Sequence, residues 1–294
     1  MMIIERPEDY NQIKCHTAVA LGAFDGIHLG HMALLREIKS AQGLVPTVFT
    51  FAQSKGKYIT SNAQRKEIFA SAGAEVCVFR HFDEAFKNLE PEVFVEKYLF
   101  ENLRAKLVVV GFNYRFGKGG KGDGVLLQHL CKGFGIDVVI VPAVEYQGCP
   151  ISSTRIRSCI NTADFYNANT MLGRNFSIEG VVQQGDKIGS KIGFPTANIL
   201  PHSARVMPPE GVYATIATIN GQKYKSITNF GGKPTIRDGV HLIETHAIGF
   251  NGELYGEQIQ VEFVKKLRDI TAFSGVAELT AQLQTDLRIR IDMD

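Results

Sequence analysis

Two histidines stand at a spacing suited to binding a phosphate group. They occur in the segment Gly22-Ala-Phe-Asp-Gly-Ile-His-Leu-Gly-His31, where two residues separate His28 from His31. The apolar run Thr17–Leu21 before this segment predicts a strand, and the residues after it predict a helix. Backbone amides and the helix dipole at such a strand-to-helix turn attract anions. Two imidazoles there would stabilise the charge that develops in nucleotidyl transfer.

The same loop offers further groups to a phosphate, because its glycines let a ligand approach the backbone. The phosphate-binding residues expected here are Gly22, Phe24, Asp25, Gly26 and Gly30. A capped helix preceded by turn glycines would show the same pattern, so the spacing alone leaves both interpretations open.

A second segment, Ile151-Ser-Ser-Thr-Arg-Ile-Arg157, follows the last apolar β run of the first half. Its hydroxyl groups are either a helix cap or phosphate ligands. Together with the HxGH motif, this segment resembles the nucleotidyltransferase superfamily, in which HxGH and ISSTxxR loops hold the phosphates of ATP from both sides. The resemblance implies phosphate binding by Ser152, Ser153 and Thr154. The catalytic residues that it implies are His28, His31 and Arg157.

The second half of the chain carries a glycine-rich segment, Gly185-Asp-Lys-Ile-Gly-Ser-Lys-Ile-Gly-Phe-Pro-Thr-Ala-Asn198. Glycine amides can surround phosphates, although a plain β-turn would use the same residues. The residues expected to bind phosphate here are Gly185, Lys187, Gly189 and Gly193.

The elements that position these motifs can be predicted from periodicity. In the first half, short runs rich in Val, Ile and Phe alternate with helical patterns, which is typical of a doubly wound parallel sheet. The expected strands are Thr17–Leu21, Pro46–Phe51, Glu75–Phe79, Lys106–Val110 and Asp137–Val141. The expected helices are Met32–Lys39, Asn62–Ala72, Pro91–Asn102 and Val125–Phe134.

The pattern of predicted elements changes after Ile151. Two helices, Ser153–Ile160 and Ala163–Leu172, lead into short alternating strands separated by Gly, Pro, Asn and Asp turns. This pattern predicts a compact antiparallel barrel, closed by a last helix at Val276–Arg290. We therefore expect an α/β domain at residues 1–173 and a β domain at residues 174–294.

Composition bounds the function. A chain of 294 residues, 45% hydrophobic and 21% charged, favours two globular domains. Its 32 basic and 30 acidic residues are too balanced for a protein that mainly grips nucleic acid. No run of roughly 18 apolar residues predicts a membrane span, and the first residues do not resemble a signal peptide. The five cysteines form no CxxC pair, so we expect reduced thiols and a cytoplasmic protein. From the charge balance and the absence of a long apolar run, we expect neither nucleic acid nor a membrane as partner.

The order of motifs along the whole chain resembles the bifunctional riboflavin kinase/FAD synthetase family. The HxGH segment, Gly111-Phe-Asn-Tyr-Arg-Phe-Gly117 and ISSTRIR follow the order of its adenylylating half. Pro195-Thr-Ala-Asn198 resembles its riboflavin kinase signature, and further matches surround Glu244. The resemblance implies a nucleotidyltransferase domain followed by a riboflavin kinase barrel. It also implies that the chain phosphorylates riboflavin to FMN with ATP and then adenylylates FMN to FAD, releasing pyrophosphate.

The resemblance also implies residue roles in the second half. Thr196 and Asn198 would hold Mg²⁺ and the ATP phosphates, and Glu244 would accept the proton of the riboflavin 5′-hydroxyl. The flavin-binding residues it implies are Asn113, Phe116 and Arg268. Core packing for Phe116 and a solvated charge for Arg268 stay open as alternatives. Mg²⁺ is the implied cofactor, the flavins and ATP are substrates or products, and a homo-oligomer is left open.

One segment departs from the family pattern. Many members read Thr-Phe-Asp-Pro-His-Pro after the second strand, whereas this chain reads Thr50-Phe-Ala-Gln-Ser-Lys55. This departure leaves open a riboflavin kinase with weakened adenylylation. A separate alternative is a non-catalytic flavin-sensing regulator that retains the fold, but the near-neutral charge and the presence of Thr196, Asn198 and Glu244 argue against it. Adenylylation of another phosphorylated metabolite would explain the histidine pair but leave the second domain unexplained.

Overall fold

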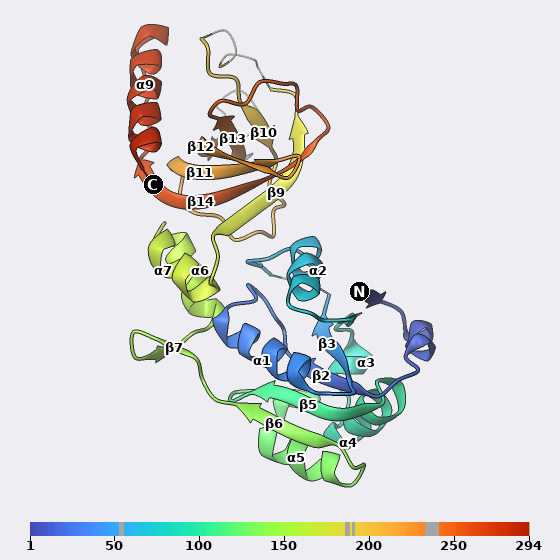
Figure 1. Cartoon of the computed structure of the whole chain (residues 1–294). Helices are drawn as coiled ribbons and strands as arrows, with labels where there is room; N and C mark the ends of the chain where they lie inside the picture. Colours follow the sequence, from blue (N-terminus) through green and yellow to red (C-terminus); the bar gives the residue numbers. More distant parts are fainter. Residues whose placement is uncertain (53–55, 186–188, 190–191, 233–240, 294) are drawn as a thin grey trace. The chain divides into compact units, whose positions relative to one another are not determined.

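A computed structural model describes residues 1–52, 56–185, 189, 192–232 and 241–293 of the chain (Figure 1). The contacts divide the chain into two compact units, Met1–Ser153 and Thr154–Asp294. The division expected from sequence, between Gly173 and Arg174, differs from this one by two helices, α6 (Ser153–Asn161) and α7 (Phe165–Leu172).

Unit 1 is built on a parallel sheet. Its strand order is β1-β4-β3-β2-β5-β6, and every neighbouring pair is parallel. The strands are β1 (Met2–Ile4), β2 (Thr17–Leu21), β3 (Val45–Phe51), β4 (Val76–Arg80), β5 (Ala105–Gly111) and β6 (Asp137–Val141). Strands β3 and β4 are added on one side of β2, and β5 and β6 are added on the other side, so the direction of strand addition reverses between β2 and β5.

Helices cover both faces of this sheet because successive strand residues point to opposite sides. Ala18, Ala20 and Val48 pack with residues of α1 (Leu29–Ser40) and α2 (Asn62–Ser71) in one buried cluster. Val19 and Leu21 belong to a second cluster, which includes residues of the π-helical segment η2 (Phe94–Asn102) and of α5 (Gly124–Lys132). The remaining helical segments of unit 1 are η1 (Pro7–Gln12), α3 (Glu84–Lys87), α4 (Pro91–Val93) and η3 (Lys118–Gly120). The predicted doubly wound sheet is confirmed.

Unit 2 is a closed barrel with helices attached. Its strands follow the order β10-β13-β12-β11-β14-β9 in antiparallel pairs. They are β9 (Phe176–Gln183), β10 (Ala197–Ile199), β11 (Gly211–Ile219), β12 (Gln222–Gly232), β13 (His241–Ala247) and β14 (Gln258–Arg268). The barrel predicted from the alternating strands is confirmed.

Helix α7 packs with the barrel through aromatic rings. The Phe165 ring lies 5.3 Å from the Phe263 ring and 5.8 Å from the Tyr213 ring, centroid to centroid. All three side chains are buried. This shared aromatic core explains why α7 groups with the strands that follow it rather than with the parallel sheet.

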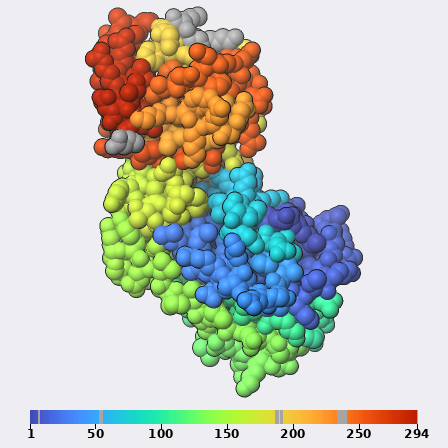
Figure 2. All heavy atoms as spheres, in the orientation of Figure 1, coloured from blue at the N-terminus to red at the C-terminus, as the bar shows by residue number. Residues whose placement is uncertain are grey.

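The last helix, α9 (Val276–Asp292), lies along the barrel, and Figure 2 shows its residues in red beside the orange strands. Its attachment is largely polar. The Arg290 guanidinium, 2% exposed, donates to the Thr215 carbonyl at 3.0 and 3.1 Å. Lys225 Nζ donates to the carbonyls of Ile291 and Met293 at the end of the helix.

Four short strands were not predicted from the sequence. β1 pairs with β4 at the edge of the parallel sheet, β7 (Glu145–Tyr146) forms a small hairpin with β8 (Cys149–Pro150), and β10 lies in the barrel between β13 and β9. Each has two or three residues, which is too few to display a period of two.

Candidate active sites

The histidine loop lies where ligands bind in open α/β sheets. It connects β2 to α1, and the segment Gly111–Gly117 follows β5, the neighbour of β2. Because the strands are parallel, both segments leave the sheet at the same edge. The order of strands reverses between β2 and β5, and such a switch point opens a crevice at the carboxyl ends of the strands.

The two imidazoles stack on each other at the start of α1. Their ring centroids are 3.7 Å apart with 19° between the planes. His28 is the N-cap of α1, and its Nδ1 accepts a hydrogen bond from the backbone N–H of His31 at 3.4 Å. Since Nδ1 is the acceptor, a neutral His28 carries its proton on Nε2. A ligand phosphate at this helix start would meet the imidazoles, backbone amides and the positive end of the helix dipole together.

The loop before His28 contains residues in sparsely populated backbone conformations. Phe24 and Ile27 have φ of 51° and 39°, and Gly26 between them has φ of 83°. Left-handed conformations of non-glycine residues typically cost about 1–3 kcal/mol each and persist only where the surroundings enforce them. Phe24 and Ile27 are completely buried, backbone included, so the structure gives Phe24 a packing role, and the phosphate contact expected of it stays a prediction.

Close packing also restricts this loop. A Cβ added at Gly30 would stand 3.1 Å from the His28 ring, and one at Gly22 would stand 3.1 Å from the Phe24 ring. Both distances are tighter than ordinary van der Waals contact. The two glycines therefore leave room for the rings.

Asp25 joins three segments of unit 1. Its Oδ1 accepts the backbone N–H groups of Ile59 and Thr60 at 2.8 and 3.3 Å. Its carbonyl accepts the Ser153 hydroxyl at 2.8 Å. This last bond brings the first residue of the ISST helix to the histidine loop, as the pairing of the two motifs predicts.

The other residues of the ISSTRIR segment follow Ser153 along α6. Ser152 is half-buried just before the helix, Thr154 is exposed on its first turn, and Arg157 is half-buried. The phosphate contacts expected of these residues stay a prediction.

The segment after β5 contains two predicted flavin-binding residues, one at the surface and one in the core. Asn113 is exposed, whereas Phe116 is 7% exposed and packs on Phe94 at 5.6 Å and Tyr114 at 5.8 Å between ring centroids. These contacts give Phe116 a packing role. The flavin-binding role expected of both residues stays a prediction.

In unit 2, three polar residues form one row across neighbouring strands. Asn198 of β10 is directly opposite Glu244 of β13, which is directly opposite Asn229 of β12. Side chains paired in this way start about 4.5–5.5 Å apart. Asn229 Nδ2 donates a hydrogen bond to Glu244 Oε2 at 3.2 Å. Thr196 lies two residues before Asn198, so the extended chain places it on the same side.

The opposite face of these strands is closed by hydroxyl groups. Thr228 Oγ1 bonds to Thr245 Oγ1 at 2.9 Å and to Thr215 Oγ1 at 2.8 Å, and Ser226 bonds to Thr215 at 2.8 Å. All four side chains are at most 2% exposed. The buried network fixes the backbone that carries the Asn198, Glu244 and Asn229 row.

Asn198 has an acceptor that the described residues leave unused. It is 6% exposed, and its Oδ1 is buried without a hydrogen-bond partner among them. A Cβ added at Gly185 would stand only 1.9 Å from Asn198 Nδ2. Gly185 therefore makes room for this amide, which is a role the sequence did not reveal.

The rest of the glycine-rich segment is only partly described. Gly189 lies close to the Phe194 carbonyl, which would be 2.3 Å from an added Cβ, and Gly193 is exposed with φ of 83°. Thr196 is exposed. The expected phosphate ligand Lys187 lies outside the described residues, as do Gln53, Ser54 and Lys55 of the segment that departs from the family pattern.

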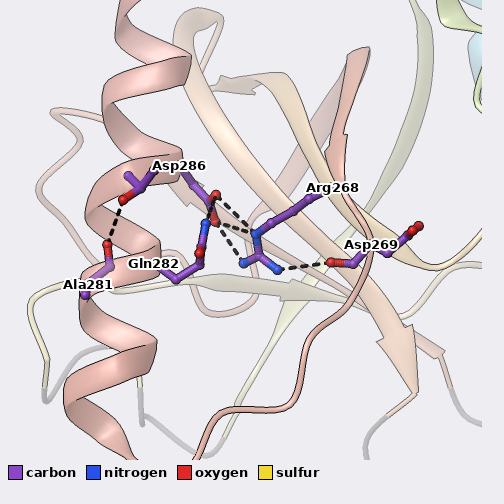
Figure 3. A network of polar contacts seen from close by, with 6 residues as sticks. Arg268, Asp269, Ala281, Gln282 and Asp286 are labelled. Carbon is purple, nitrogen blue, oxygen red and sulfur yellow. Dashed lines mark hydrogen bonds and ion pairs between the residues drawn. The ribbon is translucent and has the colours of Figure 1, made fainter.

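Arg268 is bound within the barrel unit (Figure 3). Its Nη2 and Nε donate to the Asp286 carboxylate of α9 at 2.9 and 3.1 Å, and its Nη1 donates to the Asp269 carbonyl at 3.1 Å. Asp286 is 1% exposed. These bonds attach the end of β14 to α9, and the flavin-binding role expected of Arg268 stays a prediction.

Two residues in these sites were not predicted from the sequence. Asn229 lies within a strand, and the sequence gives no sign of the register that places it opposite Glu244. Arg65 of α2 is completely buried at the edge of the sheet where the histidine loop lies. In the sequence it stands among polar helix residues, where an arginine is usually solvated.

The comparisons with known proteins cover both units. The family model of FAD synthetase matches residues 10–155, and that of riboflavin kinase matches residues 172–292. The bifunctional riboflavin kinase/FMN adenylyltransferase of Bacillus subtilis is 34% identical over 289 residues, with 93% of this chain and 91% of that protein covered. The protein of the same name from Haemophilus influenzae is 32% identical over 300 residues, covering 98% and 97%.

A solved structure shows the same fold along the whole chain. The crystal structure described as a macrolide-efflux protein from Streptococcus pneumoniae superposes with a TM-score of 0.89 at 31% identity, covering 100% of both chains. Among the described residues of the present chain, no helix combines the length and apolar character needed to cross a membrane.

Proposed function

The chain belongs to the bifunctional riboflavin kinase/FMN adenylyltransferase family, and we propose which of its residues carry out the two reactions. One reaction transfers the γ-phosphoryl group of ATP to riboflavin and forms FMN. The other transfers the adenylyl group of a second ATP to FMN and forms FAD with release of pyrophosphate. We assign phosphorylation to the barrel and adenylylation to the parallel sheet with the ISSTRIR segment.

Glu244 is the general base of the phosphorylation. Its carboxylate accepts the proton of the riboflavin 5′-hydroxyl as that oxygen attacks the γ-phosphorus, and the bond to the β,γ-bridging oxygen breaks. Asn229 supports this role, because its hydrogen bond to Oε2 holds the carboxylate in place on β13. A positioned general base typically contributes about 10²- to 10⁴-fold in rate.

The residues beside Glu244 fit a magnesium ion. The buried Oδ1 of Asn198 has no protein partner among the described residues, and leaving such an acceptor unpaired typically costs about 1–3 kcal/mol. Oxygen ligands suit Mg²⁺, which takes few protein groups and completes its shell with phosphates and water. Thr196 and Asn198 would hold the ion, and bound Mg²⁺ would neutralise the phosphate charge during transfer.

Adenylylation needs no protein nucleophile. An oxygen of the FMN phosphate attacks the α-phosphorus of ATP, and the bond to pyrophosphate breaks. His28 and His31, with the amides at the start of α1, stabilise the negative charge on the phosphates. Ser153 supports the loop through its bond to the Asp25 carbonyl. Arg157, four residues further along α6, supplies positive charge to the leaving group in this proposal.

The observation that carries the kinase assignment is the row of Asn198, Glu244 and Asn229 on adjacent strands. The test is chromatography of the products formed from riboflavin with Mg·ATP, beside a sample given FMN. We expect FAD in both. Glu244→Gln should suppress FMN formation and spare FAD formation from FMN, whereas His28→Ala should do the reverse. Loss of both activities in either folded variant contradicts the two-site assignment.

The departure at Ala52–Lys55 supports one second candidate, a kinase with weakened adenylylation. In that case riboflavin would stop at FMN, and supplied FMN would stay unchanged. We also propose a cytoplasmic location, which the five free cysteines and the nucleotide substrate support.

A further inference from the structure

Arg65 is a buried cation with no part in the chemistry above. Its residue exposure is 0%, and burial lowers the pKa of its guanidinium to about 10, with the nearby Asp25 charge acting in the opposite direction. It therefore remains charged at neutral pH. A buried charge costs desolvation energy, which an apolar side chain of similar volume would avoid.

The hydrogen bonds of Arg65 connect three segments. Nη1 donates to the Phe51 carbonyl at the end of β3 at 2.9 Å and to Asn62 Oδ1 at 3.0 Å. Nη2 donates to the Ala23 carbonyl at 3.1 Å and also to the Thr50 hydroxyl. The Thr50 hydroxyl in turn donates to the same Ala23 carbonyl at 3.1 Å.

These bonds meet the histidine loop where its backbone is unusual. Ala23 directly precedes Phe24, the first of the residues with positive φ that lead to His28. The loop needs an external restraint at this point, because relaxation of Phe24 and Ile27 to ordinary φ values would displace the start of α1. A planar guanidinium can bind the end of β3 and the loop at once, which a single ammonium does less well.

We infer that Arg65 is a positioning residue for adenylylation, which holds the Ala23 carbonyl so that His28 and His31 stay aligned with the ATP phosphates. The inference rests on the proposed role of the histidine pair. Displacement of a catalytic group by about 1 Å can cost about 10²-fold in rate. Arg65→Met should therefore lower kcat for FAD formation from FMN by about 10²-fold, with smaller changes in the KM values for FMN and ATP.

The same chain supplies the main control. Riboflavin phosphorylation by Arg65→Met should stay within twofold of the unaltered protein, which would show that the loss is confined to the first unit. Lys66→Met is the matched variant, because Lys66 follows Arg65 on α2 but pairs with Glu5 at the surface. It should leave both reactions unchanged. Arg65→Lys should recover part of the adenylylation kcat, since it keeps the charge and loses the fork.

Thr50→Val decides the matter if Arg65→Met does not fold. It removes the hydroxyl shared by Arg65 and Ala23 with little change of shape, and it should lower adenylylation kcat by about fivefold to tenfold. Unchanged adenylylation kcat in a folded Arg65→Met or in Thr50→Val overturns the inference. If instead the unaltered chain leaves FMN unchanged, or His28→Ala has no effect, the proposed function of the histidine pair fails and the inference falls with it.

Discussion

Gly185 should be indispensable for phosphorylation although it has no side chain to offer. An alanine Cβ at this position would stand 1.9 Å from Asn198 Nδ2, whereas ordinary contact begins near 3.4 Å. The Asn198 amide would therefore have to move by about 1.5 Å. A displacement of this size at a ligand of the phosphates typically costs about 10²-fold in rate or more. We expect Gly185→Ala to lower kcat for FMN formation by at least that factor.

The assay is FMN production from riboflavin and Mg·ATP, followed by chromatography, with FAD production from supplied FMN measured in the same preparation. Adenylylation should be unchanged, because Gly185 belongs to the barrel unit. Gly275→Ala is the matched control. An added Cβ there would have no atom within 4 Å, and the backbone is extended with φ of −177°.

Phosphorylation by Gly185→Ala at the normal rate would refute the argument that this glycine makes room for Asn198. A loss shared by Gly275→Ala would refute it as well, since the effect would then not depend on the close approach. The same crowding predicts how Gly185→Ala combines with the loss of the Asn198 side chain. Asn198→Ala in the Gly185→Ala background should cost little beyond Gly185→Ala alone, because both remove the same amide from its place.

Three further outcomes are expected. Asn229→Ala should lower kcat for FMN formation by about tenfold or more, because a hydrogen bond to a charged group is worth about 1.5–3 kcal/mol. FAD formation from FMN is the control. Asp286→Ala should destabilise the barrel unit by about 3 kcal/mol in urea unfolding, since Arg268 loses its buried carboxylate. Asp269→Ala is the control, because that side chain is 87% exposed and its loss should leave the urea midpoint almost unchanged. Burial raises the pKa of the Cys77 and Cys131 thiols to about 12, so both stay protonated at pH 8. They should resist a thiol reagent that modifies the exposed Cys15 and Cys149. Rapid modification of either buried thiol would contradict their burial.

The longer strands of both units, those of five residues or more, could be predicted from the sequence because each has a strong local pattern. β2 and β6 have the predicted bounds, Thr17–Leu21 and Asp137–Val141, and the predicted β3, β4 and β5 differ by one residue at their ends. β1 could not be predicted, because its three residues become a strand only through pairing with β4, more than seventy residues later. Partners so distant leave no periodic signal in a short segment.

The chemistry of the sites was visible where a residue type is unusual in its position. The histidine pair and the Pro195–Asn198 segment stood out in this way. Arg65 did not, because an arginine on an amphipathic helix is usually solvated, and its burial results from contacts with Ala23 and Phe51 in other segments. Asn229 gained its importance only from the register that places it opposite Glu244.

The closure of the barrel has a consequence for the chain during synthesis. Its first strand, β9, pairs with its last, β14, and α9 attaches only after β14. The parallel sheet, by contrast, is complete once β6 has been made. The first unit can therefore fold on the ribosome while the second still exposes unpaired strand edges, which attract other chains. Aggregation during production should arise in the barrel, and slower elongation over its last fifty or so residues should leave the first unit native.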